Sequence, residues 1–221
     1  MIVKICGITT LHDARMALDA GTDWIGLNLV SGPRRIELPA VLNILKGLDA
    51  PAAAVALVHL PYGESDKSIL MALTEHGVRR LQLYGTVTSS TIADLRGKGF
   101  ETIFVCPVSN ERSLEELDSF LATCGDARPD YVLFDAAVAG QAGGSGRRAN
   151  WDAIADAHKQ GRFQQWPLVI LAGGLTPDNV GEAVQRIAPA GVDVSSGVES
   201  SPGLKDPRKI QAFLTAARAD G

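Results

Sequence analysis

Short apolar runs, many of them β-branched, recur along the whole chain with polar stretches between them. Runs of this length and composition predict the buried strands of a parallel sheet. The eight candidates are Ile2–Cys6, Trp24–Leu29, Ala53–Val58, Arg80–Leu83, Thr102–Cys106, Tyr131–Asp135, Leu168–Ala172 and Gly191–Val194.

Helical stretches lie between these runs. They include Leu11–Ala20, Ser65–His76, Leu114–Ala122, Trp151–Gln160, Pro177–Ile187 and Pro207–Ala219. Two of them carry a start signal: Thr176 precedes Pro177, and Asp206 precedes Pro207. Proline is favoured at the first helical position, directly after a polar cap.

Eight strand–helix repeats predict the α/β fold class. Because eight parallel strands close into a barrel, they predict a single (β/α)8 TIM barrel in particular. No linker, low-complexity tract or break in composition interrupts the chain. We therefore expect residues 1–221 to form one domain.

Strand alternation predicts polar side chains inside the upper barrel. Successive residues of a strand point to opposite faces. With the aliphatic residues turned toward the helices, the inward positions are Lys4 and Cys6, Gly26 and Asn28, and Gln82 and Tyr84. A packing role alone would favour aliphatic residues there, so this face predicts a functional site.

Composition and charge limit the classes of partner and the cellular location that we expect for this protein. The 221 residues carry a net charge of −4, with 46% hydrophobic and 5% aromatic residues. No basic run suggests a nucleic-acid partner, and no apolar stretch is long enough for a signal peptide or a membrane span. Three cysteines without metal spacing or an even disulfide set indicate a reducing, cytoplasmic location.

Glycine turns follow the last two predicted strands, at Gly173-Gly174 and at Ser195-Ser196-Gly197. Backbone amides free of side chains, beside helix starts, form anion sites, and the loops after strands seven and eight commonly hold phosphate in this fold. The glycines would equally permit tight turns without a ligand. Two such turns in these positions favour a phosphorylated small molecule.

Two strand ends carry reactive groups. Asp135 ends the sixth strand, where apolar neighbours would favour a protonated acid, although aspartates at loop starts often cap helices. Cys6 ends the first strand and could act as a base if Lys4 or an arginine stabilises its thiolate. Most lone cysteines are instead small core residues, and Cys106 also ends a strand.

Other rim residues leave alternatives open. Arg34 or Arg35 could hold a carboxylate through two hydrogen bonds, while one of the pair is expected to be a solvated surface residue. The segment Gly143-Gly144-Ser145-Gly146-Arg147 fits a mobile cover or a plain connection. His59 is the one histidine at a strand end.

Taken together, these segments resemble phosphoribosylanthranilate isomerase, a (β/α)8-barrel family of tryptophan biosynthesis, over nearly the whole chain. The resemblance rests on Lys4–Thr9, Gly26 with Pro33-Arg34, Leu81–Gly85, Asp135 with Gly143–Gly146, Leu171–Val180, Val192–Glu199, Pro202-Gly203 and Lys205-Asp206.

The resemblance implies an Amadori rearrangement of N-(5-phosphoribosyl)anthranilate that needs no metal or organic cofactor. Asp135 matches the general acid and Cys6 the general base. Arg34 matches the arginine that meets the anthranilate carboxylate. The phosphate grip matches Gly173, Gly174, Ser196 and Gly197. Monomer and homodimer both remain open, since aliphatic residues on outer helices serve core and interface alike.

The chain departs from the family at several positions. Tyr84 replaces the usual histidine, His59 replaces a small polar residue, Arg35 falls where an aromatic is usual, and the loop before Arg34 is short. Two alternatives stay in view. A histidine-pathway isomerase would be expected to use aspartates as both acid and base, and a non-catalytic phosphate-binding barrel would need neither Cys6 nor Asp135.

Overall fold

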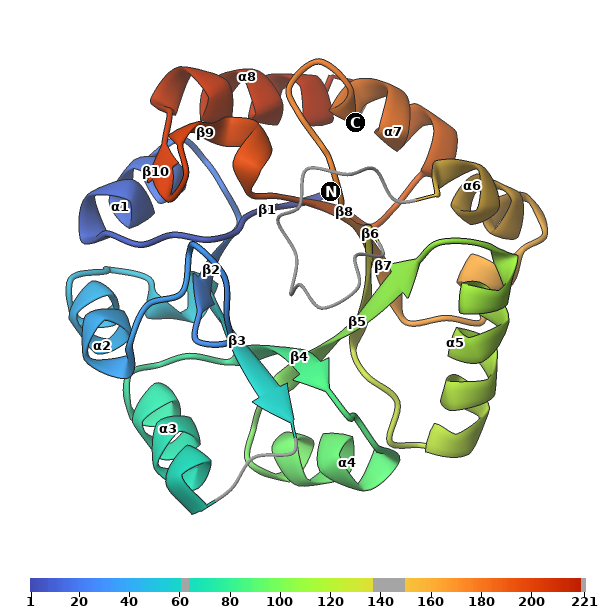
Figure 1. Ribbon diagram of the computed structural model, residues 1–221, viewed down its shortest axis with the longest axis horizontal. Helices are drawn as coiled ribbons and strands as arrows, with labels where there is room; N and C mark the ends of the chain where they lie inside the picture. The colour runs from blue at the N-terminus through green and yellow to red at the C-terminus, as the bar shows by residue number, and fades with distance from the viewer. Residues whose placement is uncertain (61–63, 137–149, 220–221) are drawn as a thin grey trace.

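Eight parallel strands close into a barrel in chain order in the computed structural model, which describes residues 1–60, 64–136 and 150–219 (Figure 1). This confirms the predicted α/β class and the (β/α)8 barrel. The strands are β1 Ile2–Ile5, β2 Trp24–Asn28, β3 Ala54–Leu60, β4 Arg80–Gly85, β5 Glu101–Val108, β6 Tyr131–Ala136, β7 Leu168–Leu171 and β8 Gly191–Val194. Pairing of Ile2 with Gly191 through Ile5 with Val194 joins β1 to β8 and closes the barrel.

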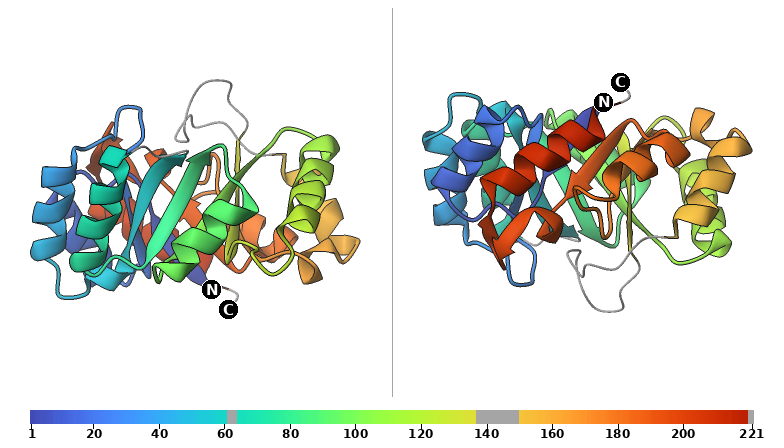
Figure 2. Two further views of the ribbon diagram at one scale, coloured as in Figure 1. Left: turned by 90° about the horizontal axis from the view of Figure 1, so that it is seen from below. Right: turned by 90° about the horizontal axis from the view of Figure 1, so that it is seen from above.

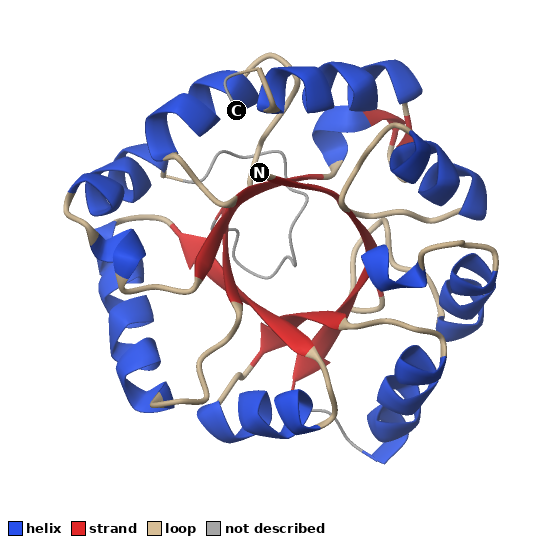
Figure 3. Cartoon of the chain, turned by 180° about the vertical axis from the view of Figure 1, so that it is seen from behind, coloured by secondary structure: helices blue, strands red, loops and turns tan. Residues whose placement is uncertain are grey.

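Helices surround the barrel as an outer ring (Figures 1 and 3). They are α1 Leu11–Asp19, α2 Leu38–Lys46, α3 Glu64–Glu75, α4 Ser89–Gly97, α5 Glu111–Cys124, α6 Trp151–Lys159, α7 Val180–Ile187 and α8 Pro207–Ala217. The side views show them running alongside the strands (Figure 2). None of the helices in the described part of the chain is both long and apolar enough to cross a membrane.

One predicted helix start is confirmed and the other is wrong. The Asp206 side chain accepts hydrogen bonds from the backbone N–H groups of Arg208 and Lys209, so α8 begins at Pro207 as expected. Helix α7 begins at Val180 rather than at Pro177. The Asn179 carboxamide oxygen accepts a hydrogen bond from the Thr176 N–H, which closes a separate turn before the helix.

The chain after β8 contains more structure than the sequence predicts. A 3-10 turn, Ser196–Val198, leads into a hairpin of β9, Glu199–Ser201, and β10, Leu204–Lys205. Thr9 ties this hairpin to the first βα loop, because its hydroxyl donates to the Gly203 carbonyl at 2.8 Å. The hairpin therefore places β10 next to the start of α1.

Apolar side chains fill the amino-terminal half of the barrel interior. This inner cluster consists of Trp24, Val55, Ile103, Leu133 and Ile170, with Ala172 after β7 at its pocket end, and is separate from the larger core between barrel and helices. The Trp24 ring packs edge-to-face on Tyr131 and lies 4.6 Å from the Arg80 guanidinium carbon. Each of these three residues begins a strand, so they close the amino-terminal end of the barrel.

Candidate active site

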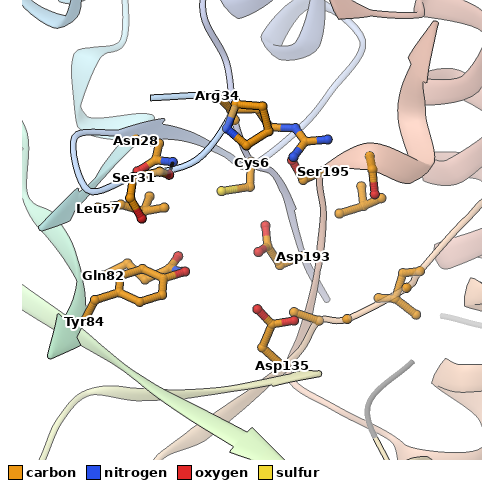
Figure 4. Close-up of a pocket in the computed structure, with 18 residues that line it drawn as sticks. Cys6, Asn28, Ser31, Arg34, Leu57, Gln82, Tyr84, Asp135, Asp193 and Ser195 are labelled. Atoms are coloured by element: carbon orange, nitrogen blue, oxygen red, sulfur yellow. Dashed lines mark hydrogen bonds between the residues drawn. The ribbon is translucent and has the colours of Figure 1, made fainter. Parts of the chain in front are cut away.

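A pocket lies at the carboxyl ends of the strands, on the opposite side of this inner cluster from Arg80. Its lining comes from β2, β3, β4, β6 and β8 and from the loops that follow β1, β2, β7 and β8. Cys6, Asn28, Gln82 and Tyr84 all line it, which confirms the inward face predicted from strand alternation. Figure 4 shows Cys6, Asp193 and Asp135 on one side of this space and Gln82 with Tyr84 across from them.

Most of the predicted site residues meet here. Cys6, Arg34, Asp135, Gly173, Gly174 and Ser196 line the pocket. Gly197 lies next to it rather than in its lining. The segment 143–147, which supplied part of the resemblance, lies outside the described residues.

Cys6 follows directly after β1, and its environment is set by two buried charges. Lys4 is fully buried and its Nζ donates to Asp193 Oδ1 at 2.9 Å. Burial raises the pKa of the Cys6 thiol and Asp193 adds to this, while Lys4 opposes both. Burial alone would lower the pKa of Lys4, but the Asp193 carboxylate and Cys6 outweigh it, so Lys4 remains charged. The resemblance included Asp193, but sequence reasoning assigned it no role.

Asp135 enters the pocket from β6, where its neighbour across the sheet is Pro107 of β5. Its side chain is largely buried, with 9% of the residue exposed. A carboxyl group at this position can reach a bound molecule in the pocket, as a proton donor must. The structure thus places a candidate acid and a candidate base in one pocket.

Tyr84 is the main departure from the family pattern inside the pocket. Burial and the negative groups around it, Cys6, Asp135 and Asp193, hold its pKa well above the usual range for tyrosine. The phenol therefore stays protonated. Gln82 Nε2 donates to the Tyr84 oxygen at 2.9 Å, which leaves the phenol proton as a donor. A family histidine would titrate near neutral pH, and this residue does not.

Arg34 sits on the loop after β2 and is largely buried. The Asn28 side chain braces this loop, because it accepts from the Val30 N–H and donates to the Ser31 carbonyl, both at 2.8 Å. Arg34 forms a bidentate ion pair with Glu199: its Nε donates to Oε1 of Glu199 at 2.6 Å, and its Nη2 donates to Oε2 at 2.7 Å. Arginine has five N–H donors, so three remain for other partners.

Glu199 joins Arg34 to the hairpin after β8. Lys205 Nζ donates to Glu199 Oε1 at 2.8 Å and to the Ser195 carbonyl at 3.1 Å. Burial raises the pKa of Glu199, but hydrogen bonds from Arg34 and Lys205 outweigh this and hold it below its usual value. Sequence reasoning quoted Glu199 and Lys205 in the resemblance without giving them a role. For Glu199 the signal was a charge among small and apolar residues, whereas Lys205 lies in a charged segment and gave no such signal.

Of the two neighbouring arginines, Arg35 is the surface residue. Its side chain is 47% exposed and forms an ion pair with Glu37 at 3.0 Å. His59 is exposed and does not line the pocket; its ring lies against Gly85. The expectation that one arginine of the pair is solvated is therefore confirmed.

The glycines after β7 and β8 have conformational reasons to be glycine. Gly173 and Gly174 have φ of 80° and 68°, in the left-handed region that favours glycine. A Cβ on Gly197 would lie 2.0 Å from the Leu175 carbonyl oxygen. The two loops thus touch, which brings both glycine turns to one side of the pocket. This geometry explains the glycines without a ligand, so the phosphate role stays a prediction.

The fold and the pocket define a class: a (β/α)8-barrel protein with a candidate acid and base at the carboxyl ends of its strands. Residues 3–216 match the family model described as N-(5′-phosphoribosyl)anthranilate (PRA) isomerase. The enzyme of that name from Citrifermentans bemidjiense is 36% identical over 98% of this chain and 96% of its own length.

Solved structures agree with this. One is phosphoribosylanthranilate isomerase in complex with reduced 1-(o-carboxyphenylamino)-1-deoxyribulose 5-phosphate, 27% identical, with a TM-score of 0.79 over 99% of this chain and 100% of that one. Another, of monomers generated from the dimeric Thermotoga maritima enzyme, is 27% identical with a TM-score of 0.80 and the same coverage. The chain belongs to the N-(5′-phosphoribosyl)anthranilate isomerase family and is therefore an isomerase of tryptophan biosynthesis.

Proposed function

We propose that Asp135 and Cys6 are the acid and the base of an Amadori rearrangement, in which N-(5-phosphoribosyl)anthranilate becomes 1-(2-carboxyphenylamino)-1-deoxyribulose 5-phosphate. The observation that carries the proposal is that both side chains line one largely buried pocket. The furanose ring oxygen and C2′ of one bound substrate can then each meet one of these groups without the substrate leaving the site.

The reaction needs two proton transfers. Asp135 gives its proton to the furanose ring oxygen, the C1′–O bond breaks, and the anilino nitrogen's lone pair forms the iminium. Cys6, as thiolate, then takes the proton from C2′, and that C–H electron pair forms the C1′–C2′ double bond of an enolamine. The enolamine tautomerises to the ketone. The positive iminium acidifies C2′, so a weak base is sufficient.

Substrate binding is proposed to use the two ends of the pocket. Arg34 meets the anthranilate carboxylate with donors that Glu199 does not occupy. Gly173, Gly174, Ser196 and Gly197 hold the phosphate through backbone amides. The carboxylate and the phosphate thereby fix the sugar between them, next to Cys6 and Asp135.

The proposal also covers domain organisation, cellular location, oligomeric state and the class of partner. We propose that residues 1–221 form a single domain, that the enzyme works in the cytoplasm as a monomer or homodimer, and that its partner is a phosphorylated small molecule rather than a nucleic acid. A net charge of −4 without a basic run supports the last point.

The decay of phosphoribosylanthranilate fluorescence on addition of purified protein tests the function. We expect saturable decay with wild-type protein and catalysed decay at least about a hundredfold slower with Asp135→Asn. Fluorescence decay that is equal in the two proteins would contradict the assignment of Asp135. No decay with folded wild-type protein would contradict the proposed activity itself.

A further inference from the structure

Lys4 is a charged residue in a place where charge is costly. It is fully buried inside the barrel, directly below the pocket, and it comes two residues before Cys6 on the same inward face of the chain. A lone ammonium group at such a site would lose its proton or destabilise the fold. Its 2.9 Å ion pair with Asp193 keeps it charged.

Gly26 brings the Lys4 ammonium and the Cys6 thiol together. This residue of β2 faces the barrel interior, and a Cβ added to it would lie 2.7 Å from Cys6 Sγ and 3.1 Å from Lys4 Nζ. The missing side chain is thus the space into which both atoms fit. The β2 strand pairs Trp24 with Lys4 and Ile25 with Ile5, which fixes Gly26 beside Cys6.

Other charged groups also face Cys6, and their effects differ in sign and size. Burial and Asp193 raise the pKa of the thiol, while Lys4 lowers it more than any other group and Lys205 of β10 lowers it less. Among the described residues, Arg34 on the loop after β2 and Tyr84 on β4 also interact with Cys6, and Asp135 on β6 lies in the same pocket. Lys4 is therefore the main group that offsets the cost of a buried thiolate.

We propose that Lys4 is a positioning residue for the isomerase reaction: its ammonium, held by Asp193 and lodged with the Cys6 thiol against Gly26, is the counter-ion of the Cys6 thiolate. This inference rests on the proposed function of Cys6. Asp193 has the role of keeping Lys4 protonated and in place, at a moderate cost to the thiolate. Gly26 has the role of leaving room for the pair.

The test measures the thiolate directly, by the rate at which iodoacetamide alkylates Cys6 as a function of pH. Peptide mapping separates Cys6 from Cys106 and Cys124, which are buried elsewhere. We expect Lys4→Met to raise the apparent pKa of alkylation by about one unit or more, equivalent to at least about a tenfold slower reaction at a fixed pH below it. An unchanged alkylation profile would overturn the proposal.

Lys4→Met also leaves Asp193 without its partner, and a second variant separates that effect. In Lys4→Met/Asp193→Asn both charges are gone, and we expect the pKa of Cys6 to stay above the wild-type value. A return to the wild-type value would mean that unpaired Asp193, rather than the loss of Lys4, caused the shift, and would overturn the proposal. Lys205→Met removes another buried lysine and is the matched control, with a smaller expected shift.

Gly26→Ala tests the contact without removing a charge. The added methyl must push the thiol and the ammonium apart, so we expect the pKa of Cys6 to rise here too. This variant also serves if Lys4→Met does not fold. A Gly26→Ala protein with wild-type alkylation would show that the close approach has no effect on the thiolate and would contradict the proposal.

Turnover measured beside alkylation distinguishes this inference from the proposed function. If Cys6 is the base, Lys4→Met should lose kcat at neutral pH and recover part of it as the pH rises and the thiolate forms. If alkylation shifts as expected and kcat does not change, Lys4 is the counter-ion of Cys6 but Cys6 is not the base. That result would contradict the catalytic assignment and the reaction role of Lys4, while the ion pair itself would stand.

Discussion

The two ends of the barrel interior contain opposite chemistry. At the amino-terminal end, Val55, Ile103, Leu133 and Ile170 pack into an apolar layer. Toward the carboxyl end, Lys4, Cys6, Asp135 and Asp193 are also buried, yet each carries an ionisable group. Burial costs little at the first end and a great deal at the second.

The contrast separates residues that hold the barrel together from residues that act. An apolar layer stabilises the fold in proportion to the surface it removes from water. The charged layer is retained although ion pairs in such places are often no more stabilising than apolar side chains. We infer that it is kept for its chemistry, and substitutions at the two ends should fail in different ways.

The largest effect is expected for Asp135→Asn at the charged end. The amide cannot give a proton to the ring oxygen, and loss of a general acid typically costs about 10²–10⁴-fold in rate. The unfolding temperature should change little, since the amide has nearly the same shape. Steady-state kinetics measures the loss of rate, and thermal unfolding measures the change in stability. If Asp135→Asn turned over as fast as wild type, Asp135 would not be the general acid.

Cys6→Ser should reduce kcat by a similar or slightly smaller factor, about 10²–10³-fold. A serine hydroxyl is a much weaker acid than a thiol, so almost no alkoxide forms even beside Lys4. Stability should be retained, because the two side chains are close in size. Near-normal turnover in the serine variant would mean that another group takes the C2′ proton.

Leu133→Ala at the apolar end should lower the stability of the fold and leave the activity nearly unchanged. It removes a side chain that is 1% exposed, and such truncations cost about 2–5 kcal/mol of the free energy of unfolding. Urea unfolding measures this loss. At a temperature where the variant is folded, kcat should stay within about twofold of wild type, well below one factor of ten or 1.4 kcal/mol. A large fall in kcat would contradict the view that the apolar end contributes to stability and not to catalysis.

The smallest of these effects is expected at the rim, for Arg34→Ala. Hydrogen bonds to charged groups contribute about 1.5–3 kcal/mol, so KM should rise about 10–100-fold while kcat falls less. Arg35→Ala is the matched control, because Arg35 is half exposed and pairs with Glu37 on the surface. Equal KM values for the two variants would contradict a carboxylate-binding role for Arg34.

Strand and helix patterns in the sequence determined the barrel, because each strand–helix unit carries its own local signal. Alternation within strands also identified the inward-facing residues Cys6, Asn28, Gln82 and Tyr84 correctly. Local signals were weaker at element ends. The turn closed by Asn179 moved the start of α7 by three residues, from the expected Pro177 to Val180, because a side-chain hydrogen bond there competes with the helix.

Only the tertiary structure decided which charges meet. Lys4 and Asp193 are 189 residues apart in sequence, and Arg34 and Glu199 are 165 apart. No local pattern links such residues, since closure of β8 onto β1 brings the first pair together and the hairpin after β8 brings the second. The sequence by itself determined that Cys6 faces the barrel interior, whereas the fold decided which ammonium group lies beside its thiol, because electrostatic effects depend on distance in space rather than along the chain.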